Sequence, residues 1–212
     1  PLGVYAGAYP KRASSKLIMS GSILGISLPS FWVGMMMIYI FAVVLRLLPA
    51  SGRGNTVMVG NVALSIFAPG GIRYVILPAI TLALTNVATM LRLTRSGILE
   101  NMRQDYIKFA RAKGVPAKSI LFGHALKNAL IPVVTVIGLQ FGSLLGGATL
   151  TETVFAWPGV GRLLVDSIKS KDAPLVLGGV IMMTITFSIV NLCVDILYAF
   201  IDPRIKAQYK KK

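Results

Sequence analysis

Residues 105–134 read DYIKFARAKGVPAKSILFGHALKNALIPVV, and this stretch decides the fold. It is basic and amphipathic, it is broken at Gly114 and Pro116, and strongly apolar segments lie on either side of it. A lipid interior accepts neither its charged side chains nor a broken backbone. We therefore expect this stretch to lie at a membrane surface as two short helices, where another molecule can contact it.

The composition supports a membrane setting. The chain is 55% hydrophobic and only 14% charged, whereas soluble domains are roughly 25% charged. A net charge of +15 would suggest nucleic acid in a soluble chain, but the Lys and Arg residues cluster beside apolar runs and form no basic stripe interleaved with aromatics. We expect a lipid membrane as a partner and no nucleic acid.

Four apolar runs are long enough to cross a bilayer, because about 20 helical residues span its hydrocarbon core of about 30 Å. They cover residues 17–48, 74–91, 129–150 and 175–201. Pro29 lies within the first run, which is too long for one straight crossing, so a kink, a tilt or an interfacial first turn is expected near residues 28–29. Pro78 and Pro132 fall near the starts of the second and third runs, where a missing amide costs least. The sequence predicts an all-α, polytopic helical bundle with four complete transmembrane helices plus the end of another in residues 1–10.

The distribution of Lys and Arg predicts the orientation. Sixteen of the 22 lie in residues 10–16, 92–128 and 202–212, and the other six lie in or beside residues 49–73 and 151–174. The positive-inside rule places the first three stretches in the cytoplasm and the last two outside.

Small and polar residues predict how the helices meet. A glycine recurs every four residues at Gly138, Gly142 and Gly146. Such a face, repeated once by Gly21 and Gly25, lets a neighbouring helix pack closely. Asn191 and Asp195 should face protein or water, because both are costly in lipid. Asp195 lies near the predicted cytoplasmic end, which favours an anchor at the surface over an ion-binding carboxylate.

Sequence patterns of enzymes are absent. The chain contains no G-x-x-x-x-G-K-[ST] phosphate loop, no H-E-x-x-H, no G-x-S-x-G and no Cys–His cluster. Cys193 is the only cysteine and His124 the only histidine, so we predict no catalytic residue, no cofactor and no metal ligand. Ion-coupled carriers usually need several buried ionisable groups, and only Asp195 qualifies. We expect energy for any transport to come from a partner that binds the basic stretch.

Several motifs together resemble one family. They are ARAKG at 110–114, HALKNALIPVV at 124–134, ETVFAWPGVG at 152–161, LPSFW at 28–32 and DPR at 202–204. In this combination the chain resembles the inner-membrane permease subunits of binding-protein-dependent ABC importers, in the dipeptide, oligopeptide and nickel branch. Residues 108–127 occupy the position of the family's E-A-A-x3-G-x9-I-x-L-P motif. The chain departs from that motif at Lys108, Phe109, His124 and Lys127.

The resemblance implies a single transmembrane permease domain, residues 1–212, in a bacterial or archaeal inner membrane. Relatives of this type commonly have six spans, so we expect the full protein to contain a first span and most of a second before residue 1. The implied partners are a second homologous permease subunit, two cytoplasmic ATPase subunits that supply ATP hydrolysis, and an external solute-binding protein.

The resemblance also implies the functional residues. The ATPase would dock on residues 101–128, through Tyr106, Ile107, Lys108, Phe109, Ala110, Arg111, Ala112, Gly114, Ile120, His124 and Leu126. The external loop, residues 151–174, would carry Glu152, Phe155, Trp157, Pro158, Gly159 and Gly161.

The cargo and two rival classes stay open at this point. The resemblance favours inward transport of dipeptides or oligopeptides, with nickel or a nickel chelate as the alternative cargo. A passive channel would need a pore-lining filter and no docking helix, and a membrane scaffold would show no ATP hydrolysis stimulated by cargo.

The orientation can be tested in the full-length protein with single cysteines at Ser119 and Ser170 in a Cys193→Ser background. On intact cells, a membrane-impermeant thiol reagent should label Ser170→Cys and leave Ser119→Cys unlabelled, because the rule places only Ser170 outside. The reverse labelling pattern would put residues 92–128 on the wrong side for a cytoplasmic partner.

Overall fold

The structure is a computed structural model that describes residues 1–201, with the side chains of residues 143, 145–147, 195 and 197–201 left out. Three expectations therefore lie outside the described residues: the surroundings of Gly146, the side chain of Asp195, and the predicted cytoplasmic end at 202–212 with its DPR motif.

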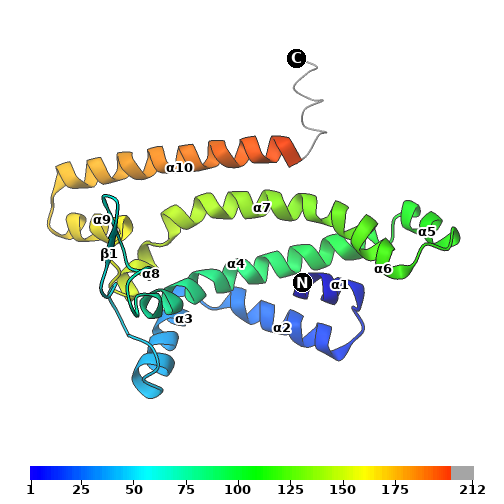
Figure 1. The fold of residues 1–212 in the computed structure, drawn as a ribbon, viewed down its shortest axis with the longest axis horizontal. Helices are drawn as coiled ribbons and strands as arrows, with labels where there is room; N and C mark the ends of the chain where they lie inside the picture. The colour runs from blue at the N-terminus through cyan, green and yellow to red at the C-terminus, as the bar shows by residue number, and fades with distance from the viewer. Residues whose placement is uncertain (202–212) are drawn as a thin grey trace, which may run out of the picture. The chain divides into compact units, whose positions relative to one another are not determined.

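The described chain is helical apart from one hairpin (Figure 1). Its helices, of which η1 and η2 are π-helices, are α1 (Leu2–Ala8), α2 (Ala13–Ser27), α3 (Ser30–Met37), η1 (Ile38–Val44), α4 (Ile72–Asn101), α5 (Asp105–Ala112), α6 (Ala117–Ser119), η2 (Ile120–Ala125), α7 (Leu126–Gly147), α8 (Thr149–Val154), α9 (Val160–Lys169) and α10 (Ala173–Ile201).

Within the described residues, three helical segments are long and apolar enough to cross a membrane: Ile72–Asn101, Ala117–Gly142 and Ala173–Val194. The pair Ala13–Ser27 and Ser30–Val44 counts as a fourth if it forms one broken span. The predicted all-α polytopic class is confirmed. The expected kink is present too, because α2 ends at Ser27 and α3 starts at Ser30, with Pro29 as its N-cap in an extended conformation.

The helices extend beyond the apolar runs that were predicted as the second and third spans. Helix α4 continues ten residues beyond 91 to Asn101, because a helix can carry Arg92 and Arg95 out of the hydrocarbon core without a break. The third span was expected to start at 129, yet the chain is helical from Ala117 onward. Pro132 therefore lies well inside a continuous helix, not near its start.

The π-helix η2 explains which side chains face inward at that helix's start. Ile120 and Ala125 are five residues apart and are both buried. In an α-helix, residues five apart point in different directions, but a π-helical turn is wider and brings them to one face. Ala129 follows four residues later on the same face.

The described residues form two compact units. Unit 1 comprises residues 1–27, 86–141 and the described part of 190–212, and unit 2 comprises residues 28–85 and 142–189.

The core of unit 1 consists of five buried residues, Ile98, Ile107, Ile120, Ala125 and Ala129. They come from the end of α4, from α5, from η2 and from the start of α7. Small residues bring the helices of this unit close together: a Cβ built on Gly97 of α4 would lie 3.1 Å from the Cβ of Ala129, and one built on Gly7 of α1 would lie 2.7 Å from the Cβ of Ile98.

The core of unit 2 forms where α3 meets α8. Phe155 is buried, and a Cβ built on Gly34 would lie 3.2 Å from its Cε2. The backbone amide of Gly52 donates a hydrogen bond to the Phe155 carbonyl at 2.8 Å, which ties the segment after η1 to the end of α8.

A short antiparallel hairpin in unit 2 was not expected. Strands β1 (Val57–Val59) and β2 (Val62–Leu64) pair with Val59 opposite Val62. Gly60 has a φ of +63° at the first position of the two-residue turn, which is the position that a type II′ hairpin turn reserves for glycine.

Candidate functional site

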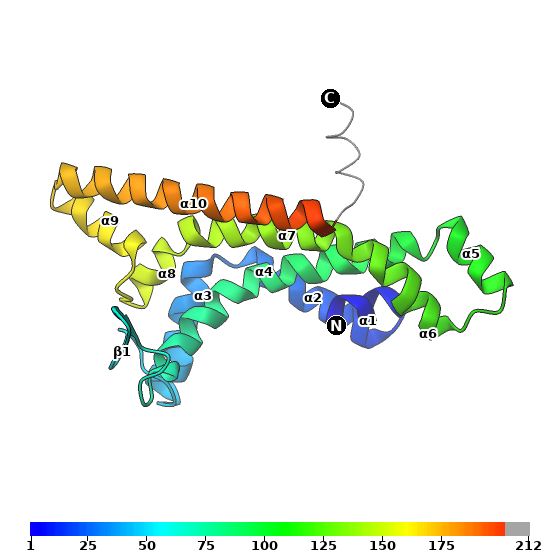
Figure 2. The ribbon, with the colours of Figure 1, turned by 45° about the horizontal axis from the view of Figure 1, so that its top comes forward.

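The α5–η2 segment, residues 105–125, is a helical hairpin built onto the ends of two long helices. Ile107 of α5 is fully buried beside Ile98 of α4 and Ile120 of η2. Figure 2 shows α5 past the end of α4, joined through α6 to α7. Full burial of an isoleucine side chain stabilises by about 1.5–3 kcal/mol, so α5 is seated on unit 1 and does not hang from it as a free loop.

A hydrogen-bonded bridge joins the same three elements through Tyr106. Its hydroxyl donates to Oδ1 of Asn101 on α4 at 2.8 Å and accepts from Nδ2 of Asn128 on α7 at 3.0 Å. Nδ2 of Asn101 in turn donates to the Gly97 carbonyl at 2.8 Å. The bridge therefore connects α5 to both long helices.

The end of α5 is a Schellman cap centred on Gly114. The Gly114 amide donates to the Arg111 carbonyl at 3.0 Å, and the Val115 amide donates to the Ala110 carbonyl at 3.2 Å. Gly114 has a φ of +79°, and no atom lies within 4 Å of a Cβ built on it. Its backbone conformation, and not lack of space, is what requires glycine there.

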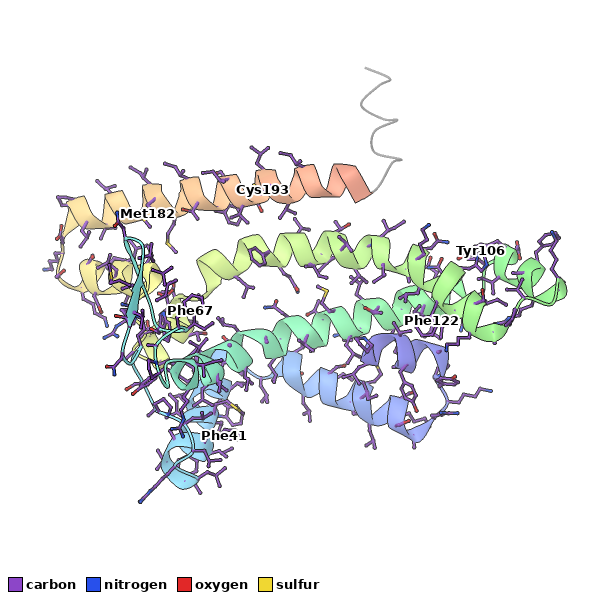
Figure 3. All side chains as sticks on the ribbon, in the orientation of Figure 1. Phe41, Phe67, Tyr106, Phe122, Met182 and Cys193 are labelled. Carbon is purple, nitrogen blue, oxygen red and sulfur yellow. The ribbon has the colours of Figure 1, made fainter. Side chains whose placement is uncertain are left out.

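The outer face of the segment is apolar in the middle and basic around it. Phe109 is 63% exposed and Phe122 is 52% exposed, and Figure 3 shows Tyr106 and Phe122 at this same end of unit 1. The Lys113 ammonium lies 4.6 Å from the centroid of the Phe109 ring, a cation–π distance. Exposed aromatic rings on a rigid helix are typical of surfaces that bind a protein partner.

One acidic side chain starts α5. The Lys108 ammonium donates to Oδ1 of Asp105 at 2.8 Å, and this hydrogen bond lowers the pKa of the Asp105 carboxyl. Both side chains are well exposed, so the pair contributes little to stability. The negative charge of Asp105 at the N-terminus of α5 is favourable for the helix dipole.

The predicted docking residues fall into three groups: buried, half-buried and exposed. Ile107 and Ile120 are buried in the core of unit 1 and position the surface from beneath. Ala110 and Leu126 are half-buried. The exposed members of the predicted set are Tyr106, Lys108, Phe109, Arg111, Ala112, Gly114 and His124.

The predicted external residues form a second ordered structure, in unit 2. Oε2 of Glu152 on α8 accepts a hydrogen bond from the Arg162 amide at 2.8 Å, so this carboxylate caps the first turn of α9. Gly159 lies directly against the Glu152 carboxylate, and Gly161 lies directly against Thr149. Neither glycine leaves space for a side chain.

Helix α8 also ends in a Schellman cap, here without glycine. The Trp157 amide donates to the Glu152 carbonyl at 2.8 Å, and Ala156 has a φ of +48°. Phe155 is buried, Trp157 is half-buried and Pro158 is exposed. Phe155 therefore anchors this segment, and Pro158 lies at its surface.

Of the three glycines in the predicted stripe of α7, the structure describes the surroundings of Gly138 and Gly142. In unit 1, Gly138 lies directly against Val194 of α10. Gly142 is buried. Of the second pair, Gly25 is buried, whereas a Cβ built on Gly21 would meet nothing within 4 Å. Among the described residues, no group of three or more His, Cys, Asp or Glu side chains could hold a metal ion.

Sequence reasoning missed the two asparagines of the bridge. Asn101 and Asn128 are 27 positions apart in the sequence, and no motif in the sequence pairs either with Tyr106. Their role depends on a tertiary contact between α4, α5 and α7.

Replacing Tyr106 with Phe removes both bridging hydrogen bonds and keeps the ring. We expect a loss of about 1 kcal/mol in the local stability of α5, which makes its amides exchange with deuterium about fivefold faster. Tyr9→Phe is the matched control, because Tyr9 has similar exposure and the side-chain hydrogen bonds described in this part of the chain do not involve its hydroxyl. Equal α5 exchange in both variants would contradict the bridge.

Comparisons with known proteins agree with this architecture. Residues 1–207 match the model of the family described as binding-protein-dependent transport system inner membrane component. A dipeptide transport system permease protein of Alkalihalophilus pseudofirmus is 44% identical over 202 residues, which cover 90% of this chain and 61% of the relative. A dipeptide transport system permease protein of Escherichia coli is 40% identical over 221 residues, covering 97% of this chain and 65% of the relative.

A third relative has another name. The glutathione transport system permease protein of Escherichia coli is 40% identical over 204 residues, covering 96% of this chain and 61% of the relative. The chain thus spans somewhat less than two thirds of the length of these curated relatives. The family match covers nearly all of the chain, and the chain belongs to the binding-protein-dependent transport system inner membrane components, a family of multi-pass membrane permeases.

Proposed function

We propose that the full-length protein is the permease subunit of an ATP-driven importer that carries dipeptides or oligopeptides inward across a bacterial inner membrane. The observation that carries the proposal is the α5–η2 segment, which presents exposed aromatic rings on a base fixed to two membrane helices. Family membership supports import driven by a partner. The names of the dipeptide and glutathione permeases support a peptide cargo over nickel.

The docking surface is proposed to consist of Tyr106, Phe109 and Phe122, ringed by the exposed cations Lys108, Arg111 and Lys118. A cytoplasmic ATPase subunit would bury the aromatic rings in a groove and pair its acidic side chains with these cations. This surface keeps Tyr106, Lys108, Phe109 and Arg111 of the residues predicted from sequence, and adds Phe122 and Lys118. It omits Ile107 and Ile120, which are buried, and also Ala110, Ala112, Gly114, His124 and Leu126.

Transport would follow from a difference in docking energy between two arrangements of the membrane helices. Two ATPase subunits that close on ATP would favour the arrangement to which they dock more tightly. The Tyr106 bridge and the Ile107 contact would carry the displacement of α5 into α4 and α7. The chain itself supplies no hydrolytic group in this scheme.

A second permease subunit would cover α10. Only 6% of the apolar window of α10 is buried inside the chain, so lipid or another subunit must cover the rest. On the proposed outer side, an external solute-binding protein would deliver cargo to the α8–α9 segment, which the Glu152 cap and Phe155 hold in shape.

The docking proposal is tested with Phe109→Ser in the complete transporter. Loss of a central aromatic side chain should cost about 2 kcal/mol of docking energy, which reduces the amount of ATPase subunit that copurifies by about thirtyfold at limiting concentration. ATP-dependent dipeptide uptake into proteoliposomes should fall with it. Phe67→Ser is the control, because Phe67 is 66% exposed, close to the 63% of Phe109, but belongs to unit 2.

Full copurification of the ATPase with Phe109→Ser would remove this surface from the interface. If the unaltered complex took up nickel and no dipeptide under the same conditions, the cargo assignment would be wrong and the docking assignment would stand.

A further inference from the structure

Unit 2 contains a polar pocket of about 440 Å³ where η1 ends and α4 begins. Its lining includes two guanidinium groups, an amide and a phenol, from Arg46, Arg73, Asn55 and Tyr74. The α5–η2 segment belongs to the other unit, unit 1. The proposed function does not use it.

Among the described residues, neither arginine forms an ion pair. Nη2 of Arg73 donates to the Leu47 carbonyl at 2.8 Å, which holds this guanidinium at the pocket and leaves its other N–H groups for a ligand. The ion pairs of the described residues involve Asp105 and Asp166, not this pocket. Residues 45–74 contain three arginines and no Asp or Glu. Two guanidiniums without a counter-charge select an oxyanion, because their N–H forks match carboxylate and phosphate geometry.

The backbone at Arg46 takes an uncommon conformation to reach this position. Its φ is +52°, in the left-handed region that few non-glycine residues adopt. This residue turns the chain out of η1, so that the amides of Leu47 and Leu48 both donate to the Phe41 carbonyl, at 2.9 Å and 3.2 Å. Figure 3 labels Phe41 on this part of the ribbon. The turn places Arg46 on the pocket wall.

The pocket lies where η1, the last part of the bent pair Ala13–Ser27 and Ser30–Val44, ends and where the membrane-length helix α4 begins. Helix η1 ends at Val44 and α4 begins at Ile72, and arginine and tyrosine side chains at such ends lie at the depth of the lipid headgroups. Leu47 lines the pocket, and Val44 and Ile72 lie within two residues of its arginines in the sequence. All three of these apolar side chains are more than half exposed. A ligand that satisfies both features has a phosphate on acyl chains.

We infer that Arg46 and Arg73 bind the phosphate of one anionic phospholipid, with the acyl chains lying against Leu47 and Ile72. The shared chemistry is a phosphate oxyanion, which a free phosphate also offers. The apolar surroundings favour the lipid source.

The test is native mass spectrometry of the full-length, delipidated protein in detergent, titrated with dioleoyl-phosphatidylglycerol. One lipid per chain should bind, and dioleoyl-phosphatidylcholine should bind at least tenfold more weakly. Arg46→Asn and Arg73→Gln should each weaken phosphatidylglycerol binding at least tenfold. Arg46→Asn is chosen because Asn tolerates a positive φ, so its melting temperature should stay unchanged.

Arg53→Gln is the matched control, because it removes the same charge from the same segment outside the pocket lining; it should change affinity less than twofold. If Arg53→Gln weakened lipid binding equally, the loss of affinity would come from the overall charge of the segment, and the proposed site would be wrong. Competition by glycerol phosphate at equal concentration would assign the site to free phosphate. Displacement of the lipid by a dipeptide would assign it to a cargo carboxylate, and in either case the lipid assignment falls.

Discussion

Burial of Ile107 between Ile98 and Ile120 is the contact on which the arrangement of unit 1 depends. It converts a charged surface loop into a fixed extension of two membrane helices. The Tyr106 bridge acts on the same elements through polar groups, between Asn101 and Asn128. Apolar contact resists separation of α5, and directional hydrogen bonds resist its rotation. Together they fix the exposed aromatic rings to α4 and α7, so a displacement of this surface would move both helices.

The same principle holds α8 and α9 in unit 2. There a buried aromatic side chain, Phe155, supplies the apolar contact, and the Glu152 carboxylate supplies the directional one by capping α9. Glycines make both contacts possible, since Gly34 lies against the ring and Gly159 lies against the carboxylate. Each unit thus fixes its short surface helices with one buried side chain and one hydrogen-bonded side chain.

Sequence reasoning identified the membrane helices and the break at Gly114, because hydropathy and a left-handed turn residue are local signals. It did not identify which half of the amphipathic α5 is buried: Ile107 faces the core while Phe109 is exposed, and only the neighbouring helices decide that. The continuity of the second short helix with the third span was not predicted, because Lys118 and His124 suggested a separate surface helix, although one helix can carry such residues beyond the lipid. The hairpin did have a local signal, a Gly-Asn pair between two valine-rich runs.

The contacts of unit 1 imply that the ends of α4 and α7 move as one block under α5. A disulfide between Gly97→Cys and Ala129→Cys, in a Cys193→Ser background, tests it, since the two Cβ positions are 3.1 Å apart, near the usual disulfide spacing of about 3.5–4.5 Å. Cargo-stimulated ATP hydrolysis by the complete transporter is measured before and after oxidation. If these ends move as one block, the crosslink forms and hydrolysis stays within about twofold of each single-cysteine variant. Loss of hydrolysis on oxidation, regained with a reductant, would show that α4 and α7 must move apart and would contradict the claim.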